Sequence, residues 1–447
     1  MIAFCTTAKG RTGHITQTLA RNLADNATYP DCKFIVLGYA NTGPNCDSDG
    51  LIDYIRAHHM PDIESGRLVF YSYPCDGPFE MAKAKNIVHR CGLREGADVL
   101  VNLDADNFTF QGFAESVSNH FSDLKNRDTF LAAKVIPGQG RQFRGCSGRI
   151  CVTSAQFLNA GGYDERYTTY APDDKDFNRR LQRLGYAAVE IDPRYFRCVP
   201  HNDAVRFREY PHVRELVDDY EKQLADGPDA TIVNFGNVGC GTVYRNFSDK
   251  PITLGRIPTR IFGIGLHKTA TNSLTSALRI LGFDASHWES PRKARNIWFE
   301  MKDAGRSLTI ERHYATSDLP VSILYRELDA AYPGSKFVLT VRPEQEWLNS
   351  VRSHWDTAHN PWRASWDTDC FTNRIHTEVY GRKSFDEKVF LERYRKHNED
   401  VYDYFLGRPG DLLCMDMGRF GDGWPALCGF LGKIVPNVPY PREYVTL

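Results

Sequence analysis

Two carboxylates stand directly after an apolar run of the sequence. Asp104 and Asp106 follow residues 99–103 in an Asp-x-Asp pattern. If that run is a strand of a parallel sheet, both side chains lie at its carboxyl edge, where open α/β folds bind ligands. Two hard oxygen donors suit Mg²⁺ or Mn²⁺, and such an ion can also hold a diphosphate. The pattern therefore predicts a metal site; the alternative is a turn in which Asp104 caps a helix.

A second acidic group contains Asp173, Asp174 and Asp176, just where a helix is expected over 176–184. A hydroxyl that attacks a carbon must lose its proton as the bond forms, and a carboxylate can take it. The structural alternative is capping of the helix beside its favourable dipole. Capping needs one acid and this segment supplies three, so a general base is the favoured interpretation.

These motifs, with Gly161-Gly162-Tyr163-Asp164-Glu165 between them, resemble the inverting GT-A glycosyltransferases, particularly the bacterial family 2-like and galactosyltransferase-like members. The resemblance covers about residues 2–210 and implies a GT-A fold that binds a nucleotide sugar. It implies one role for each acid: Asp104 contacts the sugar nucleotide and shares the metal with Asp106, Asp173 holds the acceptor, and Asp174 is the general base.

The same resemblance implies further contacts: Thr6 and Arg11 at the nucleobase, Asn41 beside them, Lys85 at the diphosphate, Asn86 at the nucleoside and His201 at the metal. Asn41 stands where family members often carry an Asp that reads uracil. The nucleobase therefore stays open, with a UDP-sugar preferred. A lone His is as often a surface or packed residue, so His201 keeps that alternative.

A second group of residues that could bind a ligand lies in the other half of the chain. The apolar run 261–264 leads into Gly265-Leu266-His267-Lys268-Thr269-Ala270-Thr271-Asn272-Ser273. A strand, a glycine loop with Lys-Thr and a helix can cradle a phosphate with backbone N–H groups, a helix N-terminus and an ammonium. A Walker A loop would need Gly in place of His267, which makes an ATPase or kinase less favoured.

This loop resembles the 5′-phosphosulfate loop of sulfotransferases, with Ala270 at the second glycine; if that backbone must reach a positive φ, alanine costs free energy. The binding residues implied by the resemblance are Gly265, His267, Lys268, Thr269, Ala270, Thr271, Asn272 and Ser273. Lys268 would polarise the bridging oxygen of the sulfuryl donor. The resemblance covers about residues 260–443 and implies a P-loop-like sulfotransferase fold.

Arg342 ends the apolar run 336–341, and Ser350 follows eight residues later. In sulfotransferases an Arg and a Ser at this spacing bind the 3′-phosphate of 3′-phosphoadenosine 5′-phosphosulfate, and a guanidinium suits a phosphate dianion. The acceptor hydroxyl also needs a base. The candidates are Asp318, His287, His313 and His354; Asp318 is preferred, although it could equally cap the helix expected over 321–332.

Two other groups have mainly structural interpretations. The tryptophans Trp347, Trp355, Trp362 and Trp366 could line a groove for sugars, but core packing is the more common use. The basic residues Arg382, Lys383, Arg393, Arg395 and Lys396 are expected on a solvated helix face.

The elements that must position these residues alternate between strand and helix. Strands are expected at 2–6, 33–39, 68–73, 99–103 and 195–199, with helices after Gly13, at 51–58 and at 79–91, and a charged helix at 205–225. This order predicts an α/β fold with a mostly parallel sheet. The pattern restarts after residue 259, with a strand at 261–264, a helix at 271–281 and a strand at 336–341. We therefore expect a glycosyltransferase domain over 1–250 and a sulfotransferase domain over 251–447.

Composition narrows the classes of function. In 447 residues the formal charge is −1, which argues against a nucleic-acid binder. The 12 cysteines include no CxxC pair, so we expect reduced thiols in a cytoplasmic protein. The sequence shows no signal-peptide pattern and no apolar run of about 18 residues. A membrane-spanning segment is therefore not expected, although the chain could work beside a membrane-bound glycan assembly.

The sequence thus predicts a bifunctional enzyme of polysaccharide biosynthesis. It would transfer a sugar from a nucleotide sugar with inversion, using Mn²⁺ or Mg²⁺, and a sulfuryl group from 3′-phosphoadenosine 5′-phosphosulfate to a hydroxyl of a glycan or glycoconjugate. One alternative is a glycosyltransferase whose second domain is a degenerate nucleotide or acceptor binder. A non-catalytic glycan-binding scaffold is the alternative from another class.

Overall fold

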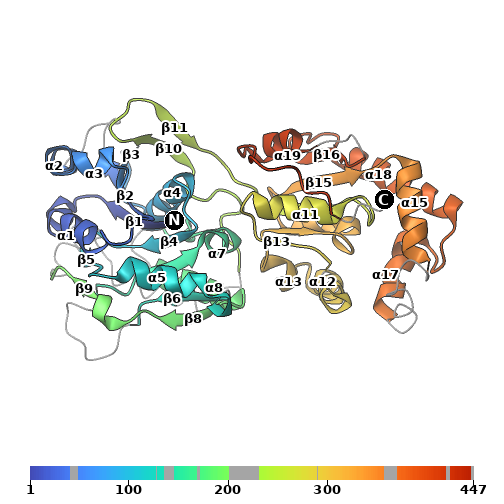
Figure 1. Ribbon diagram of the computed structural model, residues 1–447, viewed down its shortest axis with the longest axis horizontal. Coiled ribbons are helices and arrows are strands. Elements are labelled where there is room, and N and C mark those ends of the chain that lie inside the picture. Colours follow the sequence, from blue (N-terminus) through green and yellow to red (C-terminus); the bar gives the residue numbers. More distant parts are fainter. Residues whose placement is uncertain are drawn as a thin grey trace. The chain divides into compact units, whose positions relative to one another are not determined.

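The computed structural model describes residues 1–40, 49–126, 128–134, 145–168, 172–200, 231–288, 290–356, 370–418 and 423–443. Their contacts divide the chain into two compact units, residues 1–257 and 258–447 (Figure 1). Residue 250, near which the sequence analysis places the boundary, lies between two strands that pair with each other in the first unit.

The strands of the first unit are β1 Ile2–Ala8, β2 Cys32–Ala40, β3 Leu68–Pro74, β4 Val99–Asn102, β5 Asn107–Phe108, β6 Thr129–Ala132, β7 Ile150–Thr153, β8 Ala187–Glu190, β9 Arg197–Cys198, β10 Gly241–Arg245 and β11 Pro251–Leu254. Its α-helices are α1 Thr12–Asp25, α2 Leu51–His58, α3 Met60–Glu64, α4 Met81–Arg94, α5 Phe113–Ser122, α7 Ser154–Asn159 and α8 Asp173–Arg183, and its 3₁₀ helices are η1 Leu124–Asn126 and η2 Pro193–Tyr195.

The main sheet of the first unit is mixed. Its strand order is β11-β10-β3-β2-β1-β4-β7-β6-β8. The inner strands β3, β2, β1 and β4 are parallel, as the sequence predicts, but β7 and β10 run antiparallel beside them. These flanking strands are only four or five residues long, so they carry too little periodicity to be recognised in the sequence.

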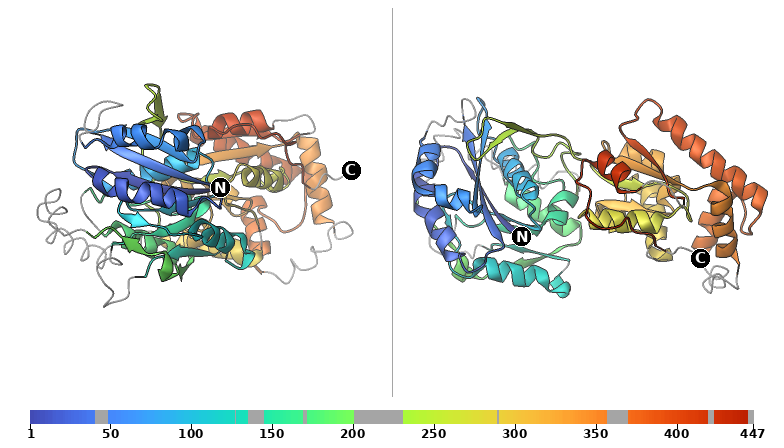
Figure 2. Two further views of the ribbon diagram at one scale, coloured as in Figure 1. Left: turned by 60° about the vertical axis from the view of Figure 1, so that its left-hand side comes forward. Right: turned by 45° about the horizontal axis from the view of Figure 1, so that its top comes forward.

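Helices cover both faces of this sheet (Figure 2). Because side chains alternate along a strand, Ala3 and Cys5 of β1 face one way while Ile2 and Phe4 face the other. The first pair lies in a buried cluster with α4, and the second in a cluster with α1, α2 and α5. Burial on both faces explains the continuous apolar runs of the inner strands.

The second unit has strands β12 Ile261–Gly263, β13 Ala285–Ser286, β14 Ala315–Ser317, β15 Lys336–Val341 and β16 Leu412–Asp416. Its helices are α11 Thr271–Ile280, α12 Pro291–Ala304, α13 Leu308–Glu311, α14 Tyr325–Ala331, α15 Glu344–Trp355, α17 Cys370–Tyr380, α18 Glu387–Phe405 and α19 Trp424–Leu431, with the 3₁₀ helix η3 Val321–Ile323. The sheet is parallel throughout, in the order β13-β14-β12-β15-β16.

The α/β class is thereby confirmed for both units. The first strand of each unit lies inside its sheet, where neighbours on its two sides come from different crossovers. β1 lies between β2 and β4, and β12 lies between β14 and β15. The carboxyl ends of such strands form the crevice in which open α/β sheets bind ligands.

Several predicted elements differ from the structure in their bounds, and three of these differences have a clear physical reason. Helix α8 begins at Asp173 and not at Asp176, because acids in a first turn complement the helix dipole. The helix expected over 321–332 is split into η3 and α14, and two of the three η3 residues are β-branched. The strand expected over 195–199 is shortened to β9, because the preceding 3₁₀ helix continues to Tyr195.

Residues 205–225, which the sequence suggests are a charged helix, lie outside the described residues. Within the residues that the structure describes, no helix has the length and apolar character needed to cross a membrane.

Candidate active sites

A buried lysine joins the second acidic group in the first unit. The Lys85 ammonium, on α4, lies 2.7 Å from Asp173 Oδ2 and 2.7 Å from Asp174 Oδ1. Lys85 and Asp173 are almost fully buried, whereas the side chain of Asp174 is 26% exposed. Both acids lie in the first turn of α8, so residues nearly ninety positions apart meet at one point. Asp174 is the member of the group that solvent or a substrate can reach.

Asp104, which follows β4, approaches the same point across Gly148. A Cβ atom at Gly148 would lie 2.7 Å from Asp174 Oδ2 and 3.0 Å from Asp104 Oδ2. Any other residue would therefore collide with the carboxylate of Asp174 and crowd that of Asp104. The structure thus brings together Asp104 and Asp174, which the sequence analysis assigns to the donor and the acceptor.

The environment changes the protonation of this cluster. Burial, together with the charges of Asp173 and Asp104, raises the pKa of Asp174 to about 7 against the opposing charge of Lys85. Burial likewise raises the pKa of Asp104. For Lys85, burial favours the neutral amine, but the charges of Asp173 and Asp174 outweigh it and the pKa is raised well above its usual value. A carboxyl with a pKa near neutrality suits a general base.

The carboxylates of Asp104 and Asp106 both border the turn 145–148. Asp106 Oδ1 accepts a hydrogen bond from Asn107 Nδ2 at 2.8 Å, and its Oδ2 lies 3.5 Å from where a Cβ atom at Gly145 would stand. A Cβ atom at Gly145 would also lie 2.7 Å from Cys198 Sγ, so Cys198 fills that side of the turn, while the oxygens of the two acids are donors that Mn²⁺ or Mg²⁺ prefers. Within the described ranges no three metal-ligating side chains gather, and the predicted third ligand, His201, lies outside those ranges.

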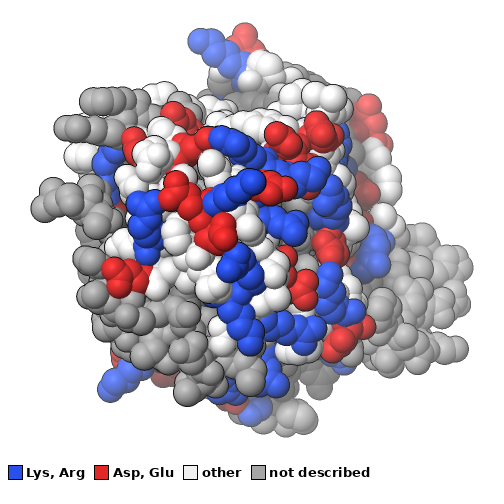
Figure 3. All heavy atoms as spheres, turned by 90° about the vertical axis from the view of Figure 1, so that its right-hand side faces the viewer, with Lys and Arg blue, Asp and Glu red and all other residues white. Residues whose placement is uncertain are grey.

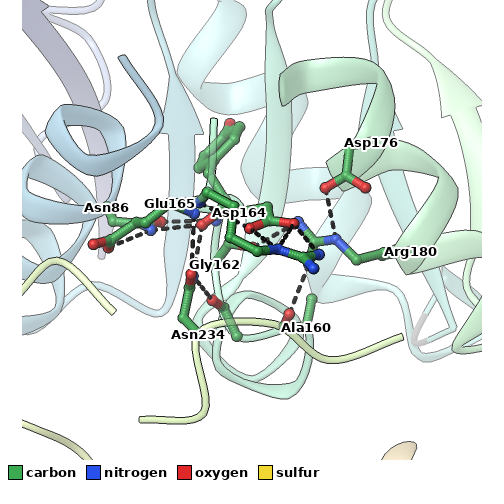
Figure 4. A network of polar contacts seen from close by, with 11 residues as sticks. Asn86, Ala160, Gly162, Asp164, Glu165, Asp176, Arg180 and Asn234 are labelled. Atoms are coloured by element: carbon green, nitrogen blue, oxygen red, sulfur yellow. Dashed lines mark hydrogen bonds and ion pairs between the residues drawn. The ribbon is translucent and has the colours of Figure 1, made fainter. Parts of the chain in front are cut away.

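The loop that carries the Gly-Gly-Tyr-Asp-Glu motif is held by buried amide and guanidinium groups (Figure 4). Asn86 accepts from the Tyr163 N–H at 2.7 Å and donates to the Tyr163 carbonyl and to Glu165. Arg180 of α8 donates to the carbonyls of Ala160 and Gly162. The network ties the loop to α4 and α8, the helices that carry Lys85 and the acid pair.

Glycine is required twice in this loop. Gly161 and Gly162 have φ values of +70° and +68°. A Cβ atom at Gly161 would collide with the Val233 carbonyl, and one at Gly162 would collide with the Asn86 amide oxygen. The motif thus has a geometric reason, because the loop must turn tightly against Asn86.

The other predicted donor residues have these places. Thr6 is buried in β1, and Arg11 is the residue before α1. Asn86 lies in the network above, and Asn41 lies outside the described residues. Their contacts with a nucleotide remain predictions.

In the second unit, the loop after β12 makes two left-handed turns. Lys268 has φ +68° and Ala270 has φ +66°. Ala270 therefore adopts the conformation in which the sequence analysis expects alanine to cost free energy. Gly265 packs against Thr340 at the end of β15, where a Cβ atom would collide with that threonine.

Most side chains of this loop face the protein. Thr269 Oγ1 donates to the Leu266 carbonyl at 2.6 Å, and it lies 2.7 Å from Thr340 Oγ1. Ser273 Oγ accepts from the Glu443 N–H at 2.9 Å, and His267 is buried among aromatic rings. Asn272 is half-buried in the first turn of α11. An anion at this loop would therefore meet main-chain groups and Lys268 more than hydroxyls.

Lys268 and Arg342 form the cationic part of this site. Arg342 Nη1 donates to the Lys268 carbonyl at 3.4 Å. Burial lowers the pKa of Lys268 and the charge of Arg342 adds to this effect, while Asp318 opposes it. Arg342 also pairs with Glu346 at 3.2 Å, a partner that the spacing of Arg342 and Ser350 does not reveal. Ser350 lies half-buried in α15.

Two of the four candidate bases meet. His287 Nε2 lies 3.2 Å from Asp318 Oδ2 and 2.9 Å from Thr271 Oγ1 in the first turn of α11. His313 instead contacts Asp284 and Lys293. His354 lies beside the buried ring of His267. The sequence contains both Asp318 and His287 but gives no sign that they are partners.

The groups with structural interpretations show those roles only in part, because Arg382 and Lys383 lie in the turn between α17 and α18 and not on a helix. Trp347 and Trp355 are buried, whereas Trp362 and Trp366 lie outside the described residues. On the face that includes α15 and α18, basic side chains are interspersed with acidic ones (Figure 3). Arg382, Arg395 and Lys396 pair with Asp386, Glu344 and Asp400.

Several known proteins are similar to parts of this chain. The "Ava biosynthesis cluster protein M" of Aspergillus versicolor is 26% identical over 216 residues, which are 41% of this chain and 80% of that protein. The mannosyltransferase PcManGT of Pyrobaculum calidifontis, solved with GDP-Man and Mn²⁺, is 15% identical with a TM-score of 0.37. The alignment covers 51% of this chain and 65% of that one, just under two thirds of its length.

TarS of S. aureus, solved with UDP-GlcNAc, is 10% identical with a TM-score of 0.36, over 90% of this chain and 92% of that one. The clearest match lies in the second unit, where residues 260–446 fit the model of the sulfotransferase domain family. This range contains Lys268, Asp318 and Arg342. The chain is therefore a transferase enzyme, and its residues 260–446 match the sulfotransferase domain family.

Proposed function

We propose that the chain is a bifunctional transferase that moves a sugar from a nucleotide sugar in its first unit and a sulfuryl group in its second. The acceptors would be hydroxyl groups of a glycan or glycoconjugate. The observation that carries the first activity is the meeting of Asp104, Asp173 and Asp174 around Lys85 at the carboxyl end of the parallel strands.

Sugar transfer requires one bond to form and one to break. The acceptor oxygen attacks the anomeric carbon from the face opposite the leaving group, and the bond from that carbon to the diphosphate breaks. The acceptor proton passes to the carboxylate of Asp174, which Lys85 and α8 hold in place. Asp173 is more deeply buried than Asp174 and fits a positioning role.

A divalent metal fits the first unit. Asp104 and Asp106 would hold it beside the turn 145–148, where the absence of a side chain at Gly148 lets carboxylate oxygens approach. The ion would neutralise charge on the departing diphosphate. This contribution matters because the Lys85 ammonium already pairs with Asp173 and Asp174 and so is less able to neutralise the diphosphate.

In the second unit, an acceptor oxygen would attack the sulfur of 3′-phosphoadenosine 5′-phosphosulfate. The bond between sulfur and the bridging oxygen breaks, and 3′-phosphoadenosine 5′-phosphate leaves. Lys268 would stabilise the charge that develops on the bridging oxygen, and Arg342 with Ser350 would hold the 3′-phosphate. The His287–Asp318 pair supports a base, since the carboxylate can orient the imidazole that accepts the proton.

One observation favours a second candidate function. Glu346 already pairs with Arg342, which weakens the attraction of that guanidinium for a phosphate. In this candidate the second unit binds a nucleotide or acceptor without transferring a sulfuryl group.

A thermal-shift screen tests the proposal, because ligands that bind the folded state raise its stability. We expect UDP-sugars with Mn²⁺ to raise the midpoint of one transition and 3′-phosphoadenosine 5′-phosphate to do so without metal. Asp104→Ala should abolish the first shift, whereas Asp53→Asn, an exposed acid in the first turn of α2, should not. Absence of both shifts in the wild-type chain would contradict the proposal.

A further inference from the structure

Two buried aromatic side chains join the elements on either side of the second site. The rings of Trp347 on α15 and Tyr394 on α18 stack with centroids 4.3 Å apart and an angle of 14° between their planes. Trp347 is fully buried, and Tyr394 is 3% exposed. Packing alone would not require a hydroxyl or an indole nitrogen here, because phenylalanine could fill much of the same space.

The hydroxyl of Tyr394 binds both main-chain groups of Arg342. It donates to the Arg342 carbonyl oxygen at 2.9 Å and accepts from the Arg342 N–H at 2.9 Å. Arg342 is the first residue after β15. One side chain therefore fixes the orientation of the peptide groups that flank this arginine.

The indole of Trp347 acts on the other side of the site. Its Nε1 donates to the His267 carbonyl at 3.2 Å. His267 directly precedes Lys268, whose carbonyl accepts from Arg342 Nη1 at 3.4 Å. The stacked pair thus links the backbone before Lys268 to the backbone of Arg342.

The chemistry of the site makes such a link useful. Lys268 has a left-handed backbone, and its partly buried ammonium lies close enough to Arg342 for the two charges to interact. Two cations repel each other, so without support the loop and the arginine would separate until an anion joins them. Groups held before the ligand arrives lose less conformational entropy on binding.

We propose that Tyr394 and Trp347 are positioning residues of the sulfuryl-donor site, Tyr394 for the arginine that holds the 3′-phosphate and Trp347 for the loop that carries Lys268. This inference rests on the sulfuryl-transfer function proposed above. Neither side chain needs to touch the donor, since each acts through a main-chain group.

Two conservative variants of the full chain test the inference. Tyr394→Phe keeps the stacked ring and removes the hydroxyl, and Trp347→Phe removes the indole N–H. The matched controls are Tyr404→Phe and Trp424→Phe. Tyr404 lies on α18, as Tyr394 does, and its hydroxyl donates to Asp329. The indole of Trp424 donates to the Val438 carbonyl.

Calorimetry with two nucleotides gives the first measurement. Tyr394→Phe should weaken the binding of 3′-phosphoadenosine 5′-phosphate about tenfold and leave the binding of adenosine 5′-phosphate nearly unchanged, because only the first nucleotide carries the 3′-phosphate. Trp347→Phe should lower kcat of sulfuryl transfer about tenfold with a smaller change in donor KM. If Tyr394→Phe weakens the binding of both nucleotides equally, its proposed positioning role is wrong. Wild-type kinetics in Trp347→Phe would overturn the role of Trp347.

Hydrogen exchange without any nucleotide gives the second measurement. Peptides that contain Arg342 should exchange faster in Tyr394→Phe, and peptides over 265–270 faster in Trp347→Phe, while both controls match the wild type. Unchanged exchange in both variants overturns the positioning inference. A wild-type chain that binds no 3′-phosphoadenosine 5′-phosphate instead contradicts the proposed function, and the exchange rates still decide whether the two residues position the backbone.

Discussion

The Lys85 ammonium lies 2.7 Å from a carboxylate oxygen of Asp174. The family resemblance suggests a contact between this lysine and the diphosphate, whereas its shortest bonds are to the two acids of α8. A cation used in this way fixes the proposed base, and in the proposed reaction the charge of the leaving diphosphate would fall to a metal. The near-zero net charge of the chain therefore conceals strong local pairing of opposite charges.

Replacement of Lys85 tests how much this buried ammonium contributes. Lys85→Met should lower the free energy of unfolding by about 3 kcal/mol at pH 8, because it leaves two carboxylates without a partner. The loss should shrink at pH 5, where the raised pKa of Asp174 lets that carboxyl bind a proton. Urea unfolding at both pH values measures the effect. Lys83→Met is the control, because Lys83 is 28% exposed and pairs with Glu80 at 3.4 Å; a loss as large as that of Lys85→Met would contradict the burial argument.

Glu95 gives the first unit a pH-dependent stability. Burial alone would raise its pKa, but hydrogen bonds from Arg245 and Tyr71 outweigh burial and lower the pKa to about 2. A lowered folded-state pKa means that the stabilisation is complete above the unfolded value of 4.5 and is lost as pH falls toward 2. Glu95→Gln should therefore cost about 2 kcal/mol at pH 7 and progressively less below pH 4.5. Unfolding across this range measures it, with the exposed Glu64→Gln as control; a constant difference would contradict the assignment.

Ala270→Gly should stabilise the second unit. Ala270 has φ +66°, a conformation that glycine adopts without strain, so we expect a gain of about 0.5–1 kcal/mol in the free energy of unfolding. Ala277→Gly, inside α11, should have the opposite sign and cost about 1 kcal/mol. Thermal unfolding compares the two variants. A loss of stability in Ala270→Gly would contradict the strain that we assign to the left-handed backbone of Ala270.

Glu346 should weaken binding of a 3′-phosphate. Its carboxylate lies 3.2 Å from Arg342 Nη2. Glu346→Gln should therefore tighten the binding of 3′-phosphoadenosine 5′-phosphate about fivefold and leave the binding of adenosine 5′-phosphate unchanged. Glu344→Gln is the control on the same helix, because that acid pairs with Arg395. Calorimetry at low salt gives both dissociation constants. Unchanged affinity in Glu346→Gln would contradict a 3′-phosphate site at Arg342.

The sequence predicts long periodic elements well and the meeting of distant side chains poorly. The helix expected at 51–58 and the strand expected at 336–341 have the observed bounds, because their apolar periodicity is strong. Asp104 and Asp174 can be proposed as site residues from motifs, but their approach across Gly148 depends on how a turn packs, which spacing does not encode. The same holds for His287 with Asp318, which join separate crossovers of the sheet, and for Tyr394 with Arg342, which lie far apart within one crossover.

The central claim is that two separate active sites operate in one chain. The most direct measurement assays metal-dependent sugar transfer and sulfuryl transfer in the same preparations of Asp174→Asn and Lys268→Ala, with Lys302→Ala as an exposed-lysine control. We predict that Asp174→Asn lowers only sugar transfer, by at least about 10²-fold, and that Lys268→Ala lowers only sulfuryl transfer by a similar factor. Survival of both activities in both variants, or their loss together in either one while the chain stays folded, would contradict the claim.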